Sequence, residues 1–165
     1  MCLGVNGIAV IEQVSDNDID SVFSLMKLNM EPYYSKRNEE WNELSIRKYF
    51  LNMKGLVMRG STELKGFSFY EPQDSRVHIH TLQISPRYQN RNLGGRFLQW
   101  YRKLAIQTEA EEITCGVFET NTAREMYRRI GFNEIEIVDG VVRMSLPLTS
   151  QCCTALSRPD SHSLA

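Results

Sequence analysis

The chain has 165 residues, of which 42% are hydrophobic and 24% are charged, and its formal net charge is −1 at pH 7. This length and composition are ordinary for one soluble globular domain with a full hydrophobic core. The near-neutral charge argues against a general nucleic-acid binder, and no apolar run approaches the length of a membrane span.

The first third of the chain predicts a strand followed by two helices. Alternating apolar residues predict a strand over Ile8–Val14, and Asp16 is predicted to cap a helix over about Asn17–Leu28. That helix is predicted to break at Met30–Tyr34, because the proline within this segment disfavours helical structure in the residue before it. A second helix is predicted over about Asn38–Met53, where apolar residues recur at helical spacing.

The next segments predict a hairpin and an irregular strand. Strands are predicted at Leu56–Arg59 and Leu64–Tyr70, joined by a turn at Gly60–Glu63. In the following predicted strand, Arg76–Ile84, the apolar positions change from odd to even numbers. They are Val77, Ile79, Leu82 and Ile84. Because strand side chains alternate between faces, a β-bulge near His80–Thr81 is predicted to bring all four to one face.

A glycine-containing loop precedes a central helix. The stretch Leu82–Gln107 begins as a strand end, turns at Ser85–Pro86 and becomes a helix with apolar residues at three-to-four spacing. The first N–H groups of a helix have no internal partner and carry partial positive charge, so they form an anion site. No Asp or Glu occurs between Ser75 and Thr108. The basic residues there are Arg76, Arg87, Arg91, Arg96, Arg102 and Lys103. This asymmetry indicates a ligand with several phosphates.

The last third predicts three strands and one helix. The strands are predicted at Ile113–Phe118, Glu134–Val138 and Val141–Leu146, and the helix at Thr122–Ile130. Gly131 is predicted to end the helix as its C-cap, and Asp139-Gly140 predicts a tight hairpin turn. Residues 149–165 are polar and lack periodicity, so we expect a mobile tail after a domain over residues 1–148.

The four cysteines, Cys2, Cys115, Cys152 and Cys153, show no metal-ligand spacing. Cys115 lies in an apolar stretch, where a buried free thiol is the default. The first residues lack the basic region of a signal peptide. Together these features predict a cytoplasmic protein without a metal or a disulfide framework.

The loop before the central helix, Gln89-Asn90-Arg91-Asn92-Leu93-Gly94, resembles the acyl-CoA loop of the GNAT superfamily of N-acetyltransferases, Gln/Arg-x-x-Gly-x-Gly/Ala. A nucleotide P-loop would need a Lys-Ser/Thr pair after its last glycine, which this loop lacks. Asn92 stands where the family usually has glycine. Because asparagine tolerates left-handed backbone conformations, we expect the turn to be kept.

A second block supports the resemblance. In residues 113–132 an apolar strand is followed by the residues that the family's next block contains. They are Asn121, Ala123, Tyr127, Gly131 and Phe132. Two blocks in the right order, about thirty residues apart, are specific together. The resemblance covers roughly residues 8–148, with the N-terminal half matching in length and pattern rather than in motif.

The resemblance implies an α/β fold with a mixed, mostly antiparallel seven-stranded sheet, helices on both faces and a splayed central strand pair. It implies transfer of an acetyl group from acetyl-CoA, as cosubstrate, to a primary amine of a small molecule. A protein N-terminal or lysine acetyltransferase is one alternative, although such enzymes tend to have a longer loop than Val138–Val141 here. A non-enzymatic acyl-CoA-binding module is another, and Asn121 with Tyr127 argues against it.

The resemblance also implies the residues of the site. The cofactor-binding set is Leu82, Gln83, Ile84, Gln89, Asn90, Arg91, Asn92, Leu93, Gly94, Gly95, Arg96, Asn121 and Tyr127. Tyr127 is the candidate proton donor, because a phenol near pKa 10 can protonate a thiolate whose acid has a pKa near 8.5. His78 or His80 is the candidate base, with His78 slightly favoured because it precedes the bulge, and a held water is the alternative. Core packing for the tyrosine and strand hydrogen bonds for the histidines are the structural interpretations.

The expected acceptor site lies between the first two predicted helices. Glu31, Tyr33 and Tyr34 fall there, and an acid with two tyrosines could hold a cationic amine by charge and cation–π contact. The expected partners are therefore acetyl-CoA and an amine, with no nucleic acid or membrane. A homodimer stays open.

Overall fold

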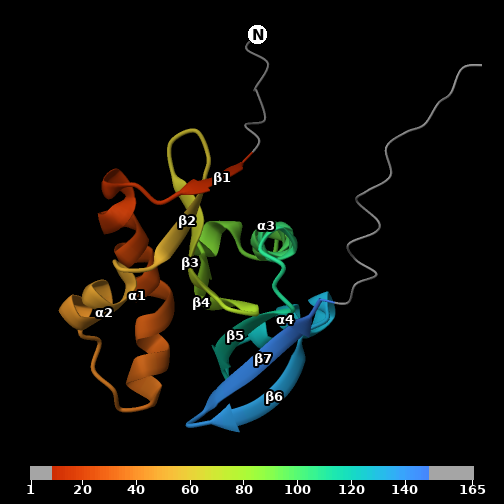
Figure 1. Cartoon of the computed structure of the whole chain (residues 1–165). Helices are drawn as coiled ribbons and strands as arrows, with labels where there is room; N and C mark the ends of the chain where they lie inside the picture. The colour runs from red at the N-terminus through yellow and green to blue at the C-terminus, as the bar shows by residue number, and fades with distance from the viewer. Residues whose placement is uncertain (1–8, 149–165) are drawn as a thin grey trace, which may run out of the picture.

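The computed structural model describes residues 9–148 (Figure 1). The strands are β1 (Val10–Gln13), β2 (Lys54–Arg59), β3 (Leu64–Gln73), β4 (Arg76–Ile84), β5 (Glu112–Phe118), β6 (Asn133–Val138) and β7 (Val141–Pro147). The helices are α1 (Ile19–Lys36), α2 (Glu43–Phe50), α3 (Leu93–Gln107) and α4 (Ala123–Ile130), with short 3-10 turns η1 (Asp16–Asp18) and η2 (Pro86–Tyr88). The predicted tail at 149–165 and three of the four cysteines lie outside the described residues.

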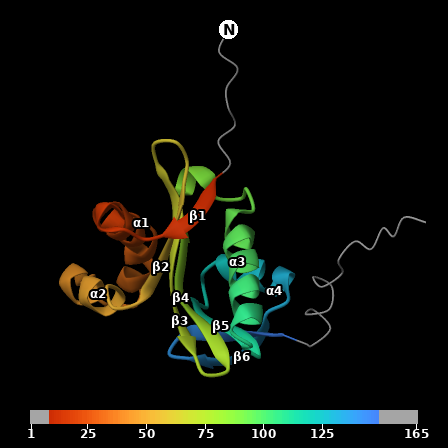
Figure 2. The ribbon, with the colours of Figure 1, turned by 45° about the horizontal axis from the view of Figure 1, so that its top comes forward.

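The seven strands form one sheet in the order β1-β2-β3-β4-β5-β7-β6. Every neighbouring pair is antiparallel except β4 and β5, which are parallel. Helices α1 and α2 cover one face, and α3 and α4 cover the other (Figure 2). This arrangement confirms the predicted fold class. Within the described chain, no helix combines the length and the apolar character needed to cross a membrane.

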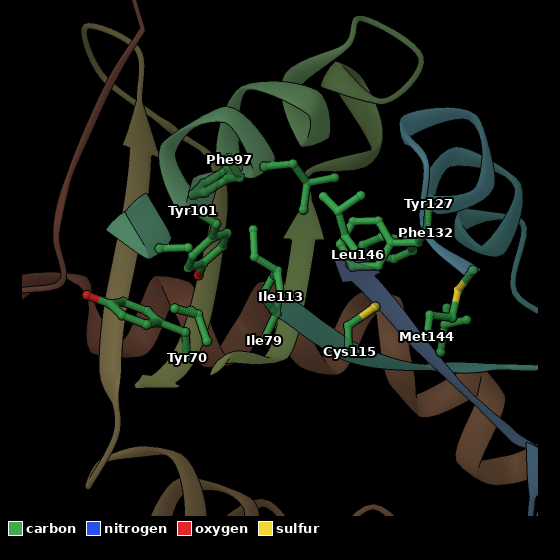
Figure 3. Packing of buried hydrophobic residues seen from close by; sticks show 14 of the residues in the cluster. Tyr70, Ile79, Phe97, Tyr101, Ile113, Cys115, Tyr127, Phe132, Met144 and Leu146 are labelled. Atoms are coloured by element: carbon green, nitrogen blue, oxygen red, sulfur yellow. The ribbon is translucent and has the colours of Figure 1, made fainter. Parts of the chain in front are cut away.

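Each face of the sheet buries its own apolar cluster. On the α3 side, Phe97 and Tyr101 pack with Ile79 and Ile113 from the two central strands (Figure 3). On the α1 side, a second cluster joins α1 to β2 and β3. It contains Val22, Phe23, Leu25, Met26, Val57, Phe67 and Phe69. Burial of large apolar side chains on both faces holds the sheet between its helices.

The two central strands separate partway along their length. Pairing of β4 with β5 runs from Arg76–Glu112 to Ile79–Cys115 and goes no further. On the other side of β4 the register with β3 shifts, because Tyr70 pairs with Ile79 whereas Phe69 pairs with Thr81. The skipped residue is His80, so the predicted bulge is confirmed. We call the region beyond Ile79 and Cys115 the splay.

A buried hydrogen-bond chain holds the bulge. The Tyr101 hydroxyl donates to Ser68 Oγ at 2.6 Å, and the Ser68 hydroxyl donates to the Thr81 carbonyl at 2.7 Å. Ser68 is fully buried. A buried hydroxyl without a partner is costly, so this chain satisfies both side chains and positions the strand next to the splay.

The first helix extends beyond its predicted end. We expected a break at Met30–Tyr34, but α1 continues through Pro32 to Lys36. The proline removes one backbone donor, yet tertiary packing beyond it holds the helix: Tyr33 stacks on Phe118 with ring centroids 5.6 Å apart. The start also differs from the expectation. The 3-10 turn that leads into α1 begins after Ser15, whose backbone N–H donates to the Asp18 carboxylate at 2.8 Å, so Asp16 is not the cap.

The second helix is shorter than its apolar pattern predicts. Asn38 adopts a left-handed backbone conformation with φ 55°, and α2 begins only at Glu43. Asn42 caps it by accepting the Ser45 N–H at 2.9 Å. Asparagine side chains compete for backbone hydrogen bonds, which favours turns and caps over helix interiors. The predicted Gly131 C-cap and Asp139-Gly140 turn are confirmed, since all three residues have positive φ.

Candidate active site

A cavity with about 800 Å³ of empty space, part of it open to solvent, occupies the splay. One wall comes from β4, the end of β5 and the start of α4, and the opposite wall comes from α1, α2 and their connection. Within residues 9–148, the lining includes one histidine but no carboxylate and no cysteine. The same described residues hold no group of three or more His, Cys, Asp or Glu placed to bind a metal ion. The cavity therefore joins the two helical layers through the sheet.

Backbone groups of β4 face the splay. The Ser85 N–H donates to the Lys65 carbonyl on β3 at 2.9 Å. Because backbone groups of a strand alternate between its two neighbours, the N–H groups of Leu82 and Ile84 point to the side that β5 has left. The Ile84 carbonyl accepts from Asn29 Nδ2 at 3.0 Å, which ties α1 to this strand. The N–H groups are thus placed to bind a carbonyl oxygen in the splay.

The loop before α3 keeps the predicted turn. Asn92 has φ 57° and Asn90 has φ 60°, both in the left-handed region. The substitution of asparagine for glycine therefore leaves the backbone conformation available, as expected. The first N–H groups of α3 follow Asn92 directly, and the first turn has no acidic residue. Gly94 is buried against α4, where a Cβ would lie 2.7 Å from Met126 Sδ.

The two predicted phosphate-binding arginines are in different surroundings. Arg91 is exposed and lies over the Tyr88 ring, with 5.6 Å from its guanidinium carbon to the ring centroid. Arg96 instead donates from Nη2 to the Ala9 carbonyl at 2.6 Å, which connects α3 to the residue before β1. Of the two, Arg91 has the more accessible guanidinium.

Tyr127 lines the cavity from α4 and also packs in the core. Only 5% of the residue is exposed, and its ring meets Phe132 edge-to-face with centroids 5.1 Å apart. Asn121 fixes the start of α4 by accepting the Ala123 N–H at 2.9 Å. Burial raises the pKa of Tyr127 well above its usual range, and the neighbouring Cys115 thiol adds to the rise. The phenol therefore stays protonated in the resting protein.

The two histidines of β4 have separate roles in the structure. His80, in the bulge, lines the cavity, with Nδ1 3.2 Å from the Tyr49 hydroxyl and Nε2 3.4 Å from the Glu71 carboxylate. His78 lies where β4 still pairs with β5, and its Nδ1 is 2.8 Å from Thr114 Oγ1. The structure brings only His80 to the cavity, whereas the sequence slightly favoured His78.

Burial lowers the pKa of His78 from 6.5 to about 4, and the charge of His80 and Arg76 adds to the effect. Because the folded pKa is below the unfolded one, stability is lost as pH falls from about 6.5 to about 4. At 1.36 kcal/mol per pKa unit, the loss is at most about 3 kcal/mol, and less because the ring is partly exposed. Between pH 7 and pH 4, the free energy of unfolding, measured with urea, should fall by roughly 2 kcal/mol less in His78→Gln than in the wild type. Parallel pH profiles would show that His78 stays charged in the folded state.

Of the three predicted acceptor residues, one reaches the cavity. Tyr34 lines it. Glu31 lies 4.0 Å from Lys27 with 47% of its side chain exposed, and Tyr33 stacks outside the cavity on Phe118. The reason is the unbroken α1 helix, which presents residues four apart on one face. Those residues are Met26, Met30 and Tyr34.

Ten aromatic or apolar cavity residues were not among the predicted site residues: Met26, Met30, Trp41, Ile46, Phe50, Ile79, Val117, Phe118, Ala123 and Val141. The four-residue spacing of Met26, Met30 and Tyr34 is visible in the sequence and could have indicated this wall, had the helix been continued through Pro32.

Comparison with known proteins identifies the family. The acetyltransferase (GNAT) domain family matches residues 29–143. Among solved structures, a PaiA N-acetyltransferase from Thermoplasma acidophilum in complex with coenzyme A aligns with a TM-score of 0.71 and 16% identity, over 86% of this chain and 99% of that one. The ribosomal-protein-S18-alanine N-acetyltransferase from Escherichia coli aligns with a TM-score of 0.68 and 16% identity, over 85% and 94%. At such identities the structural matches show the fold alone.

A search among curated proteins found no match. The family match, however, covers well over half of the chain and includes both sequence blocks that carry the resemblance. It also includes the cavity walls from Met30 to Val141, the splay and the loop before α3. The chain therefore belongs to the GNAT family of acetyl-CoA-dependent acetyltransferases and is an acyltransferase.

Proposed function

We propose that the protein acetylates a primary amine of a small molecule in the splay. The observation that carries this proposal is the cavity through the sheet, which has α4 on one side and α1 with α2 on the other. A thioester held on the α3–α4 side and an amine held on the α1–α2 side would meet between β4 and β5. Holding two reactants in one place is a major source of catalysis.

The proposed cofactor site follows the free backbone groups. The first N–H groups of α3, after Asn92, would bind the pyrophosphate of acetyl-CoA, and Arg91 would add a positive charge. Leu82 and Ile84 would donate their N–H groups to the pantetheine arm and the thioester carbonyl. Donors fixed before the reaction stabilise the oxyanion that develops on that carbonyl.

The reaction needs one proton to leave the amine and one to reach the sulfur. In the proposed step, the neutral amine nitrogen attacks the thioester carbon, and the C–S bond breaks as the new C–N bond is completed. His80 takes the proton from the nitrogen, with Glu71 and Tyr49 orienting its ring. The Tyr127 hydroxyl gives its proton to the leaving thiolate.

Contacts beside the cavity favour a small acceptor over a protein. At the end of α1, Arg37 donates to the Asp139 carbonyl in the β6–β7 turn, and its guanidinium lies 5.3 Å from the centroid of the Phe118 ring. A peptide acceptor would need an open groove between these two segments. The Arg37 contact bridges these two segments, and the two-residue turn adds no loop that could cover a peptide.

The test compares acceptor classes with one readout. Release of the CoA thiol from acetyl-CoA should be measured with a panel of small primary amines and with peptides that carry free N-termini or lysines. We expect turnover with small amines at a kcat/KM at least tenfold above every peptide. Faster turnover of peptides would reassign the protein to protein acetylation.

A further inference from the structure

The acceptor side of the cavity has a consistent chemistry. Six residues from α1, α2 and their connection line it, and all are apolar or aromatic. They are Met26, Met30, Tyr34, Trp41, Ile46 and Phe50. We call these six residues the acceptor wall. Building on the proposed function, we infer that the acceptor amine sits on an apolar body that carries no second positive charge.

No carboxylate among residues 9–148 lines the cavity to hold a second ammonium group. The nearby acids have other partners: Glu31 lies beside Lys27, and Glu39 accepts from Arg37 at 2.9 Å. An unpaired charge moved from water into an apolar site loses far more hydration energy than the site returns. A second ammonium group on the acceptor would therefore oppose binding.

Aromatic rings can hold cations over their faces, but here the rings pack against one another. Tyr34 meets Trp41 at an interplanar angle of 77° and Phe118 at 87°, both edge-to-face. In each pair the edge of one ring covers the face of the other. These rings are therefore arranged to enclose an apolar body, and they do not form an open cage for an ammonium group.

The first experiment compares n-hexylamine with cadaverine, which has the same number of non-hydrogen atoms but a second amine. Thiol release from acetyl-CoA should give a kcat/KM at least about 10²-fold higher for hexylamine. Among alkylamines from propylamine to hexylamine, kcat/KM should rise about fourfold per methylene. Equal or faster turnover of cadaverine would overturn the inference and leave the proposed function standing. If no amine and no peptide supports thiol release, the proposed function itself is overturned.

Two matched variants test whether the acceptor wall selects between the two amines. Met30→Glu places a carboxylate in the acceptor wall, and it should raise the cadaverine-to-hexylamine ratio at least tenfold. Leu28→Glu adds the same charge to the same helix at a residue that is 61% exposed and does not line the cavity, and it should leave the ratio unchanged. Equal ratios in both variants would place amine selection elsewhere. A thermal shift with CoA confirms that both variants are folded.

Discussion

Tyr127→Phe should lower kcat for amine acetylation about 10²-fold or more, while the affinity for CoA barely changes. Phenylalanine keeps the ring that packs edge-to-face on Phe132, so the core and α4 should stay in place. The change removes the hydroxyl that would protonate the leaving thiolate. Steady-state thiol release gives kcat, and the rise in Tm with CoA reports binding.

A control separates chemistry from packing, because the Tyr127 hydroxyl also neighbours the buried Cys115 thiol. Cys115→Ala removes that neighbour and leaves the phenol, so it should keep most of kcat even if stability falls. Burial raises the pKa of the Cys115 thiol to about 12, which keeps it neutral and unreactive near pH 7. Full activity in Tyr127→Phe across the pH range would return Tyr127 to a purely structural role.

Gly94→Val should abolish most of the rise in Tm that CoA produces in the wild-type protein. A ligand that binds only the folded state stabilises it in proportion to the logarithm of its concentration over Kd. The valine side chain would occupy the space between α3 and α4, where Met126 Sδ lies 2.7 Å from the position of a Cβ. It would also crowd the first N–H groups of α3.

Two further variants show which of these effects removes binding. Adding Met126→Ala to Gly94→Val relieves the collision with α4, so recovery of the Tm rise would identify packing as the cause. Continued loss would identify obstruction of the anion site. Asn92→Gly is the matched control in the same loop, and it should keep the Tm rise because glycine adopts the φ of 57° without strain. An unchanged rise in Gly94→Val would place the anion site elsewhere.

The bulge in β4 could be predicted because strand periodicity is a local property. Two apolar residues on odd positions followed by two on even positions fit one buried face only if an extra residue lies between them. The register of β4 with β3 shows that residue to be His80. The left-handed turn at Asn92 was predictable for the same reason, since it depends on the conformational range of one residue.

The acceptor wall could not be predicted, because it depends on a tertiary override of a local preference. Pro32 favours a helix end, yet α1 continues because its last turn packs on residues more than eighty positions away, such as Phe118. The helix therefore runs unbroken through Met30–Tyr34, and this fixes the direction of each side chain in that segment. Glu31 is thereby turned to solvent and Met30 into the cavity. The expected acceptor site therefore changes from one with an acid that holds a cation to one with an apolar wall.

The choice between His78 and His80 also required the three-dimensional structure. His78 and His80 are equivalent in a strand pattern, since they are two residues apart. They differ because pairing with β5 ends between them: His78 still faces Thr114 on the neighbouring strand, and His80 lies beyond the last pair. A sequence does not state where two parallel strands separate.

The most direct test of amine acetylation in the splay uses acetyl-CoA labelled with an isotope in its acetyl group. After incubation with n-hexylamine, mass spectrometry of the products should find labelled N-acetylhexylamine in amounts equal to the CoA thiol released, and Tyr127→Phe should lower both together. Thiol release without labelled amide would show hydrolysis of the thioester in place of transfer. Labelled amide formed at the wild-type rate by Tyr127→Phe and Gly94→Val alike would contradict transfer at this site.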